Sequence, residues 1–507
     1  MNSSKRFSIE QGELLVAMVV VFPLIFWNAI EHLFPMGYAG LFTQMAEQIA
    51  NLNFRLPLES PYYGPGGIPF AYPPFGLYVL AVFIKLTGKY YIFLRWLPPL
   101  FSLISIALTY LLAVKLFKSR VPAAFVAIIA SASPDLYIAH TWSSGVVRAP
   151  AFIFAILTIY FFSENLENRS VKNILLTGLF FGLAALSHLA YALFCAAWIA
   201  FFSIASRDWL TRVRDSVLSG FVGLLAASVW VVPVASRHGW EVFLGAFNSH
   251  GGENIFSLLA NPGGLLRLFQ INFSPITSNL VLAVLFLLGA YCLFRRKRYD
   301  FILFFAVIVL VFPENARFVF WLGSFFAGCG LWFAGDWAYR MALKKRDVSY
   351  SLGLLAFSMS ILAFIWWTGF KTISAFSPLL NESALELGER ASDLIPPDST
   401  YLALLIQDES EWMPFLLKRN PLTAQWGSEW LGEYNQQTRL MSLFQGCRKE
   451  KDWACVQSVL GGMDEAPQFV ITYRIERALN DQIPADGQWR EVFSNNRYIV
   501  WKAAGSP

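Results

Sequence analysis

The stretch Leu14 to Ile30, LLVAMVVVFPLIFWNAI, contains no charged residue and decides the class of fold. A transmembrane helix needs about 20 mostly apolar residues to cross ~30 Å of hydrocarbon. Lys5 and Arg6 precede the stretch, and no small-residue cleavage site follows it, so we expect a retained first membrane helix and not a signal peptide.

The composition of the whole chain agrees with this first helix. Of its 507 residues, 56% are hydrophobic and only 14% are charged, and the mean hydropathy is +0.49. Soluble domains average about 25% charged residues. The composition therefore excludes a soluble enzyme, a disordered chain and a nucleic-acid-binding protein, and it indicates a polytopic membrane protein. Five cysteines are too few for a disulfide-based scaffold.

Ten further apolar stretches follow the first one, and together they predict about eleven transmembrane helices, at 14–30, 96–114, 121–139, 149–163, 173–187, 189–205, 216–235, 277–294, 301–312, 318–336 and 350–369. Eleven crossings with the N-terminus in the cytoplasm place the basic clusters between the helices, from 115–120 to 340–346, on the cytoplasmic side. Cytoplasmic loops carry an excess of Lys and Arg, so we expect this orientation.

The orientation requires that the apolar stretch 75–86 does not cross the membrane. Residues 36–94 then form one large external loop. Within it we expect an interfacial helix at 38–50 and a connection at 62–74 that is too rich in Pro and Gly to be helical. We therefore predict a transmembrane domain over residues 1–369.

The remaining residues, 370–507, predict a soluble α/β domain outside the cytoplasm. Phe469 to Tyr473 and Tyr498 to Trp501 look like buried strands, and 383–395 has a helical pattern. Cys447 and Cys455 fall in this region, where an oxidising compartment would allow them to pair. The other cysteines, Cys195, Cys292 and Cys329, fall in predicted helices and are expected to pack there as apolar residues.

Ionisable residues near the external helix ends are candidates for function, because charge at membrane depth is costly. In this topology they include Glu31 and His32, Asp135, His140 and Arg148, His188, and Glu314 with Arg317. Each of them is also explained by simple solvation, but several loops carrying such residues favour a common external cavity. We found no P-loop, no HExxH and no CxxC motif, and no paired repeat halves of the kind that transporters show.

The order of these segments resembles the GT-C superfamily of membrane glycosyltransferases, of the protein mannosyltransferase and aminoarabinose transferase type. The segments that carry the resemblance are Tyr72-Pro73-Pro74-Phe75, Arg95-Trp96-Leu97-Pro98, Ala113 to Phe117, Ser133-Pro134 and Ser187-His188. The resemblance covers residues 14–340, by order and spacing. It adds Tyr72 and Arg95 to the candidate substrate-binding residues, with His32, His140, Arg148, His188, Glu314 and Arg317.

One departure from the family concerns the catalytic acid. The family carries an Asp or an Asp-Glu pair just before a Tyr-Ala, whereas Pro35-Met36-Gly37 precede Tyr38-Ala39 here. An inverting transfer needs a carboxylate to take the proton of the acceptor hydroxyl. Glu31 is the first candidate, because partial burial at the helix end would raise its pKa, and Asp135 is the second. Arg148 and Arg317 are candidates to stabilise the leaving phosphate.

The resemblance implies an extracytoplasmic sugar transfer from a polyprenyl-phosphate donor to a lipid, glycan or protein acceptor, by a plasma-membrane protein. It implies no certain cofactor and leaves room for a divalent cation. Oligosaccharyl transfer to protein is a second reading, which the absence of a Trp-Trp-Asp-Tyr-Gly-like stretch disfavours. The alternatives are a catalytically inactive GT-C-like protein, a transporter of lipid-linked intermediates, or a membrane scaffold. No nucleic acid partner is expected.

Overall fold

The structure is a computed structural model that describes residues 12–64, 66–249, 279–311, 316–345 and 348–505, together with Gly263. The chain divides into two compact units, each assembled from three segments of sequence. The first, which we call the helical unit, contains residues 1–33, 96–227 and 253–377. The second, which we call the mixed unit, contains residues 34–95, 228–252 and 378–507.

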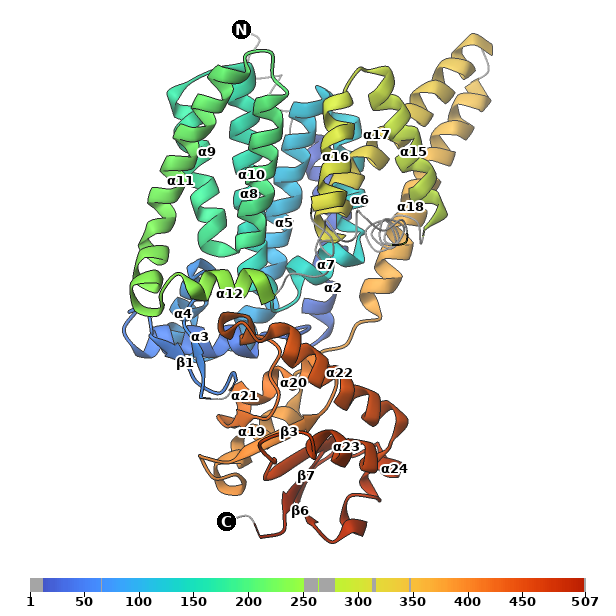
Figure 1. Ribbon diagram of the computed structural model, residues 1–507. Helices are drawn as coiled ribbons and strands as arrows, with labels where there is room; N and C mark the ends of the chain where they lie inside the picture. Colours follow the sequence, from blue (N-terminus) through green and yellow to red (C-terminus); the bar gives the residue numbers. More distant parts are fainter. Residues whose placement is uncertain are drawn as a thin grey trace. The chain divides into compact units, whose positions relative to one another are not determined.

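The helical unit contains apolar helices that pack against one another (Figure 1). Those described are α2 (Gly12–Glu31), α6 (Arg120–Ser131), α7 (Pro134–Thr141), α8 (Gly145–Glu167), α9 (Val171–Ser187), α10 (Leu189–Ile204), α15 (Leu280–Arg295), α16 (Tyr299–Val311), α17 (Ala316–Lys345) and α18 (Val348–Ser374). Two more, α5 (Tyr90–Phe117) and α11 (Trp209–His238), begin in one unit and end in the other.

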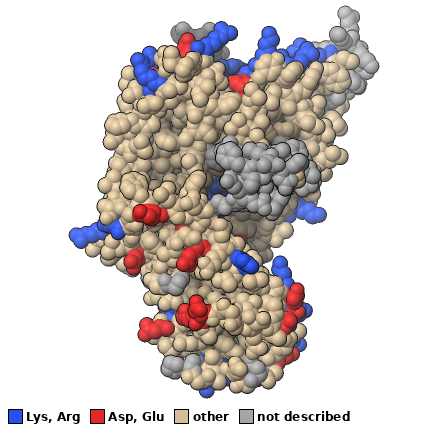
Figure 2. All heavy atoms as spheres, in the orientation of Figure 1, with Lys and Arg blue, Asp and Glu red and all other residues tan. Residues whose placement is uncertain are grey.

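Each of the eleven predicted stretches overlaps a helix. Among the described residues, six helices are long and apolar enough to cross a membrane, namely α2, α5, α8, α11, α17 and α18. The bent pair α6 and α7 makes a seventh if it counts as one span, whereas α9, α10, α15 and α16 are shorter. The chain is an integral membrane protein, and the number of eleven crossings stays a prediction. Figure 2 shows a broad uncharged surface with Lys and Arg gathered at one end of the helices.

The stretch predicted as one helix at 121–139 is broken in the structure. Helices α6 and α7 meet at an angle of 71°. Ser133 caps α7, its Oγ accepting a hydrogen bond from the backbone N–H of Leu136 at 3.3 Å, and Pro134 takes the first helical position. Ser before Pro is a strong helix-start signal, so a new helix begins where the apolar composition suggested a continuous one.

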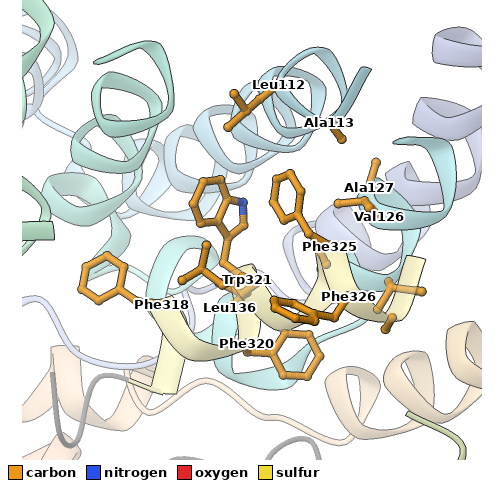
Figure 3. Packing of buried hydrophobic residues seen from close by; sticks show 14 of the residues in the cluster. Leu112, Ala113, Val126, Ala127, Leu136, Phe318, Phe320, Trp321, Phe325 and Phe326 are labelled. Atoms are coloured by element: carbon orange, nitrogen blue, oxygen red, sulfur yellow. The ribbon is translucent and has the colours of Figure 1, made fainter. Parts of the chain in front are cut away.

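Aromatic side chains from α17 form much of the core of the helical unit. Figure 3 shows Trp321 and Phe325 of α17 directed toward α5, with Val126 of α6 nearby. Trp321 is fully buried, and its indole Nε1 donates a 3.0 Å hydrogen bond to Thr109 Oγ1 on α5. Buried indole N–H groups usually find such a partner. Helices α15 and α17 approach each other closely at Gly289 of α15, which has no side chain. A Cβ at this position would overlap the backbone of α17.

The mixed unit combines short helices with a β-sheet. Its first two segments hold α3 (Gly40–Asn51), the strands β1 (Glu59–Ser60) and β2 (Ile68–Pro69), α4 (Phe75–Thr87) and α12 (Glu241–Ser249). Its last segment holds α19 (Glu382–Leu394), β3 (Thr400–Leu404), α20 (Gln407–Ser410), α21 (Trp412–Leu417), β4 (Asn420–Pro421), η1 (Ser428–Leu431), α22 (Tyr434–Glu450), α23 (Trp453–Leu460), β5 (Phe469–Tyr473), α24 (Arg477–Asn480), η2 (Pro484–Asp486), β6 (Trp489–Ser494) and β7 (Tyr498–Ala503).

The sheet has the strand order β4-β3-β5-β7-β6. Strand β3 pairs in parallel with β4 and β5, and β7 pairs antiparallel with β5 and β6. All five residues of the central strand β5 are buried, as expected for a strand covered on both faces. The strand predicted at 469–473 coincides with β5, the one at 498–501 lies in β7, and the helix predicted at 383–395 is α19.

The cysteines follow the sequence-based expectations. Cys447 and Cys455 form a disulfide bond between the end of α22 and the start of α23. Cys195, Cys292 and Cys329 are buried in helices, with the sulfurs of the last two 3.3 Å apart.

The two units do not follow the expected division at residue 369. Residues 34–95, expected as an external loop of the transmembrane domain, form one compact unit with residues 378–507. The predicted helix at 38–50 is α3, the connection at 62–74 contains no helix among its described residues, and 75–86 is α4. An independent C-terminal domain stays a prediction.

Candidate functional site

Four of the predicted site residues in the helical unit gather around one tyrosine, Tyr191. The Tyr191 ring, in the first turn of α10, is fully buried. The ring centroids of His140 and His188 lie 5.7 Å and 5.5 Å from it, both edge-on. The guanidinium carbon of Arg317 lies 5.1 Å from the same centroid. Arg148 acts electrostatically on both the Tyr191 hydroxyl and the His140 ring. We call these five residues the Tyr191 cluster.

The hydrogen bonds of the His140 ring define which of its two nitrogens carries the hydrogen. Its Nδ1 lies 2.9 Å from the backbone carbonyl oxygen of Leu136, and its Nε2 lies 2.5 Å from Tyr191 Oη. A carbonyl oxygen only accepts, so Nδ1 carries the hydrogen and Nε2 accepts the hydrogen bond from the Tyr191 hydroxyl. His140 is only 2% exposed and stacks on Phe152, so this neutral pair forms the floor of the cluster.

Two arginines form the outer part of the Tyr191 cluster. Arg148 and Arg317 are half-buried, and each acts electrostatically on both His140 and Tyr191. Arg148 Nη1 donates a 3.2 Å hydrogen bond to Ser144 Oγ. Guanidinium groups bind phosphate through two parallel N–H donors, so two half-buried arginines that both act on this cluster make it a candidate cationic site for a phosphate.

Each member of the cluster lies near a helix end. His140 is in the last turn of α7, and His188 sits between α9 and α10, where its Nδ1 accepts a 3.3 Å hydrogen bond from the backbone N–H of Ala190. Arg148 and Arg317 lie in the first turns of α8 and α17. The break between α6 and α7 therefore matters for the site, because α7 carries His140.

Of the two candidate bases, Asp135 is the one on an element of this cluster. It occupies the first turn of α7, is half-buried, and lies on the same short helix as His140. Asn28 anchors that helix, because its Nδ2 lies 2.9 Å from both Tyr137 Oη of α7 and the carbonyl oxygen of Ile373 of α18.

The other candidate base does not have the environment we expected. Glu31, the last residue of α2, is exposed, so the expected partial burial was wrong. Helix α2 ends at Glu31, and the polar side chain of this residue stays on the surface of the helical unit. His32, which follows, is half-buried. Glu314 lies outside the described residues.

The two candidates added by the family resemblance lie in the mixed unit. Tyr72 is buried, with its ring edge-on to Phe42 at 4.9 Å and to Trp430 at 6.0 Å. Arg95 is half-buried on α5. The Tyr191 cluster contains neither of them.

A carboxylate does meet the start of α3, close to the positions where the family acid is missing. It belongs to Glu411, whose two oxygens accept 2.7 Å hydrogen bonds from the backbone N–H groups of Gly40 and Leu41. The hydroxyl of Tyr63 donates to the Glu411 backbone carbonyl at 3.0 Å, and the indole of Trp412 donates to the carbonyl of Gly37 at 2.9 Å.

Burial raises the pKa of the Glu411 carboxyl to about 8, although its backbone hydrogen bonds oppose the shift. Beside it lies a cavity of about 20 Å³, large enough for one water molecule and too small for a sugar. Burial also raises the pKa of a second acid of the mixed unit, Glu429, to about 7. The hydrogen bonds that Glu411 accepts from Gly40 and Leu41 make it a structural cap of α3.

The possible divalent cation has no preformed site among the described residues. Within the described ranges no group of three or more His, Cys, Asp or Glu side chains is arranged to hold a metal ion. No chemical step is therefore assigned to a metal.

Three important residues were missed from sequence. Tyr191 follows the Ser187-His188 turn by one helical turn, so helical spacing placed it on the same side as His188. Asn28 was a polar residue inside an apolar helix, which is a signal in itself. Glu411 gave no local signal, because its partners are about 370 residues away.

The comparisons with known proteins agree with the fold. Residues 71–233 match the family model described as dolichyl-phosphate-mannose-protein mannosyltransferase. An oligosaccharyltransferase structure from Archaeoglobus fulgidus, in complex with Zn and sulfate, has a TM-score of 0.61 at 12% identity, over 91% of this chain and 68% of that chain. No curated protein matches the chain.

Two further structures cover almost the whole of this chain. ArnT from Cupriavidus metallidurans, bound to undecaprenyl phosphate, has a TM-score of 0.54 at 14% identity and covers 98% of both chains. The resemblance to the GT-C superfamily is confirmed. The mycobacterial arabinofuranosyltransferase AftD, another protein with this GT-C fold, has a TM-score of 0.52 at 14% identity, over 97% of this chain and 41% of that chain. At these identities the structures show the shared GT-C fold alone.

Proposed function

We propose that this protein is an integral-membrane glycosyltransferase that moves a sugar from a polyprenyl-phosphate donor to an acceptor hydroxyl on the extracytoplasmic face. The observation that carries the proposal is the Tyr191 cluster, in which two arginines and two histidines from four different helices or helix ends surround one buried tyrosine. The match to a mannosyltransferase family model over residues 71–233 supports the reaction class.

In this proposal Arg148 and Arg317 bind the donor phosphate. The acceptor oxygen attacks C1 of the sugar, and the bond from C1 to the phosphate oxygen breaks with its electron pair. The phosphate therefore gains charge as the sugar leaves, and guanidinium donors held in place stabilise that charge. The hydrogen bond from Tyr191 to His140 keeps the floor of the site neutral, and the two guanidinium groups supply the positive charge that faces the phosphate. The ArnT structure contains undecaprenyl phosphate, which supports a donor of this class.

The proton of the acceptor hydroxyl must go to a base, and we propose Asp135 before Glu31. Partial burial and the shared helix with His140 favour Asp135, whereas Glu31 is exposed. A base acts only within hydrogen-bond reach of the hydroxyl, so the order of these two depends on where the acceptor lies. His32, His188, Tyr72, Arg95 and Glu314 remain proposed substrate-binding residues.

The proposed face rests on two features of the chain. The basic clusters at one end of the helices favour a cytoplasmic N-terminus. The disulfide between Cys447 and Cys455 favours an oxidising compartment for residues 370–507. Both features fit a plasma-membrane protein whose acceptor is a lipid, a glycan or a protein.

A catalytically inactive GT-C-like protein, acting as a scaffold or a transporter of lipid-linked intermediates, is the second candidate. It is favoured by the absence of an acid at Met36 and Gly37. The carboxylate that reaches this segment, from Glu411, is fully buried and already accepts two backbone hydrogen bonds.

Binding of undecaprenyl phosphate to the purified protein tests the donor site. Arg317→Ala should weaken binding roughly ten- to hundredfold, since a hydrogen bond to a charged group contributes about 1.5–3 kcal/mol. Arg340→Ala, which removes a guanidinium paired with Asp336 on the same helix, is the matched control and should bind as the wild type does. Equal affinity of all three proteins would remove the arginine from the donor site.

A further inference from the structure

The turn between α15 and α16 carries four consecutive cations, Arg295, Arg296, Lys297 and Arg298. Both helices belong to the helical unit and pack beside α17 (Figure 1). Three backbone hydrogen bonds of 2.9–3.0 Å close the turn onto the last residues of α15, and Lys297 has a left-handed φ of 58°. The turn is therefore tight, and all four charged side chains leave from one short segment at the end of two apolar helices.

Three of these cations are not neutralised by a carboxylate. Arg298 is paired, with its Nε 3.1 Å from Asp300 Oδ1. A second carboxylate near this end of α15, Asp336 of α17, has its own cation, because Arg340 Nε lies 2.8 Å from it. The other three cations of the turn are exposed and form no ion pair with any described residue. Five cations, the four of the turn and Arg340, thus meet two carboxylates, which leaves an excess of three positive charges.

The neighbouring end of α5 does not supply the missing carboxylates. Arg298 Nη1 reaches it and donates a 3.3 Å hydrogen bond to the carbonyl oxygen of Leu116. Three cations and three carboxylates meet there in ion pairs of 2.6–3.8 Å, namely Lys115, Lys118, Arg120, Glu13, Glu164 and Glu167. Positive and negative charges cancel at that end, so they do not offset the excess at the α15–α16 turn.

Aromatic rings hold the two exposed arginines of the turn. The guanidinium carbon of Arg296 lies 4.5 Å from the ring centroid of Trp332 on α17. The guanidinium carbon of Arg295 lies 5.9 Å from the ring centroid of Tyr291, and its Nη1 donates a 3.3 Å hydrogen bond to Tyr291 Oη. Stacking uses the face of a guanidinium group and leaves most of its in-plane N–H donors for a second partner. Both arginines are thus held in place while their charge stays available.

The exposed apolar side chains of α15 lie next to these cations. Phe294 is 56% exposed, with its ring edge-on to Tyr299 at 5.2 Å, and Leu287, two turns earlier on α15, is 67% exposed. Trp332, which holds Arg296, belongs to α17, a candidate membrane span. Aromatic side chains are enriched at the level of the lipid headgroups, where the lipid phosphates lie. Cations beside exposed apolar side chains therefore match a molecule with a phosphate at one end and alkyl chains at the other.

We propose that the α15–α16 turn binds the headgroup of an anionic phospholipid. Arg295 and Arg296 donate hydrogen bonds to the phosphate, Lys297 adds its charge, and an acyl chain lies along Phe294 and Leu287. The unneutralised charge of the turn favours a lipid with a net negative charge over a zwitterionic one. Free phosphate would satisfy the cations but would leave the apolar side chains uncovered. The proposal does not depend on the transferase activity, because the turn shares no residue with the Tyr191 cluster.

Photo-crosslinking of the purified full-length protein tests the proposal at the turn itself. The photoreactive residue p-benzoylphenylalanine replaces Phe294, and this parent protein is placed in nanodiscs with equal amounts of phosphatidylglycerol and phosphatidylcholine. Mass spectrometry after irradiation gives the ratio of the two lipid adducts. We expect a roughly fivefold or larger excess of the phosphatidylglycerol adduct, since each cation near the membrane surface contributes about 1 kcal/mol to the binding of anionic lipid. The double variant Arg295→Gln/Arg296→Gln should remove most of this excess.

Two further variants separate the turn from other cations and guanidinium geometry from charge. The matched control Lys172→Gln/Arg207→Gln removes two exposed cations outside the turn and should leave the adduct ratio unchanged. Arg295→Lys/Arg296→Lys keeps the charge but removes the planar fork of N–H donors, so its adduct ratio should lie between those of the parent protein and the glutamine variant.

Equal amounts of the two adducts in the parent protein would overturn the proposal. So would a ratio that the glutamine variant leaves unchanged, or an equal loss in the control variant. A lysine variant equal to the parent protein would overturn the role of the stacked guanidinium groups. Loss of the excess in millimolar inorganic phosphate, but not in chloride of equal ionic strength, would assign the cations to free phosphate instead. If the glutamine double variant does not fold, Lys297→Gln alone should lower the ratio, since this side chain is exposed and unpaired among the described residues.

Discussion

The carboxylate of Glu411 accepts a 2.7 Å hydrogen bond from the backbone N–H of Gly40, across 371 residues of sequence. The residue before α3, Ala39, has no side chain that can cap the helix. The first N–H groups of a helix have no partner within it, and they carry partial positive charge. Glu411 supplies the missing acceptor from the far end of the chain, which joins residues 34–95 and 378–507 into one unit.

Glu411→Ala should destabilise the mixed unit by on the order of 3 kcal/mol, because it leaves two buried N–H groups without an acceptor. Glu411→Gln should cost less, since the amide oxygen still accepts one of the two bonds. The measurement is the thermal unfolding midpoint of the detergent-solubilised protein. Glu465→Ala, at an exposed position of the same unit, is the control. An unfolding midpoint for Glu411→Ala equal to that of the control would contradict the capping role.

The raised pKa of Glu411 predicts a pH dependence of stability. The folded-state pKa of about 8 lies above the ordinary value of 4.5, so the folded protein binds the proton more tightly than the unfolded chain does. The corresponding stabilisation is complete below pH 4.5 and is lost as the pH rises through about 8. The stabilisation from Glu429, whose pKa is about 7, is also lost as the pH rises, and this loss ends at a lower pH than the loss from Glu411.

Unfolding midpoints measured from pH 4.5 to 9 test this pH dependence. The unfolding midpoint should decline more steeply with pH for the wild type than for Glu411→Gln. Glu429→Gln should remove only the part of this decline that lies below about pH 7. Parallel curves for the wild type and Glu411→Gln would show that this carboxyl does not titrate in the folded protein as we expect.

Much of the helical unit could be predicted from sequence, because an apolar run is a local property. The stretch at 14–30 coincides with α2, and 173–187 lies within α9. The break before Pro134 also had a local signal, a Ser followed by Pro, but the apolar composition on both sides concealed it. Strand β5 was predictable because a strand covered on both faces has a continuous apolar sequence.

The rest depended on contacts that no local pattern contains. Glu411 stands close to two other acids in the sequence, Asp408 and Glu409, and only the fold brings it to Gly40. The candidate site was predicted in part, since His140, His188, Arg148 and Arg317 were chosen by their position at helix ends. Tyr191, which they surround, lay in an apolar helix and was not distinguished from its neighbours.

Tyr191→Phe tests whether the hydrogen bond to His140 stabilises the Tyr191 cluster. Removing the hydroxyl leaves the buried Nε2 of His140 without its donor, which should cost about 1–3 kcal/mol. The unfolding midpoint should therefore fall for Tyr191→Phe and should not change for Tyr291→Phe, whose hydroxyl lies on an exposed residue. If both variants unfold like the wild type, the hydrogen bond does not contribute to the stability of the site.

The proposed orientation predicts which positions an impermeant thiol reagent reaches in intact cells. Cysteines introduced at Glu59 and Lys449, both exposed, should react on the outside, whereas those at Lys172 and Arg207 should react only after the cells are opened. The native cysteines give little background, since three are buried and two form a disulfide. Labelling of Lys172→Cys in intact cells would reverse the orientation and move the Tyr191 cluster to the cytoplasmic face.

If the Tyr191 cluster transfers a sugar from a polyprenyl-phosphate donor, the purified protein in lipid nanodiscs should release free polyprenyl phosphate from one or more members of a panel of polyprenyl-phosphate sugars. We expect release from at least one donor by the wild type, a loss of at least about 100-fold in Arg317→Ala and Asp135→Asn, and full activity in Arg340→Ala. Release that is unchanged in Arg317→Ala, or no release by the wild type from any donor in the panel, would contradict the account.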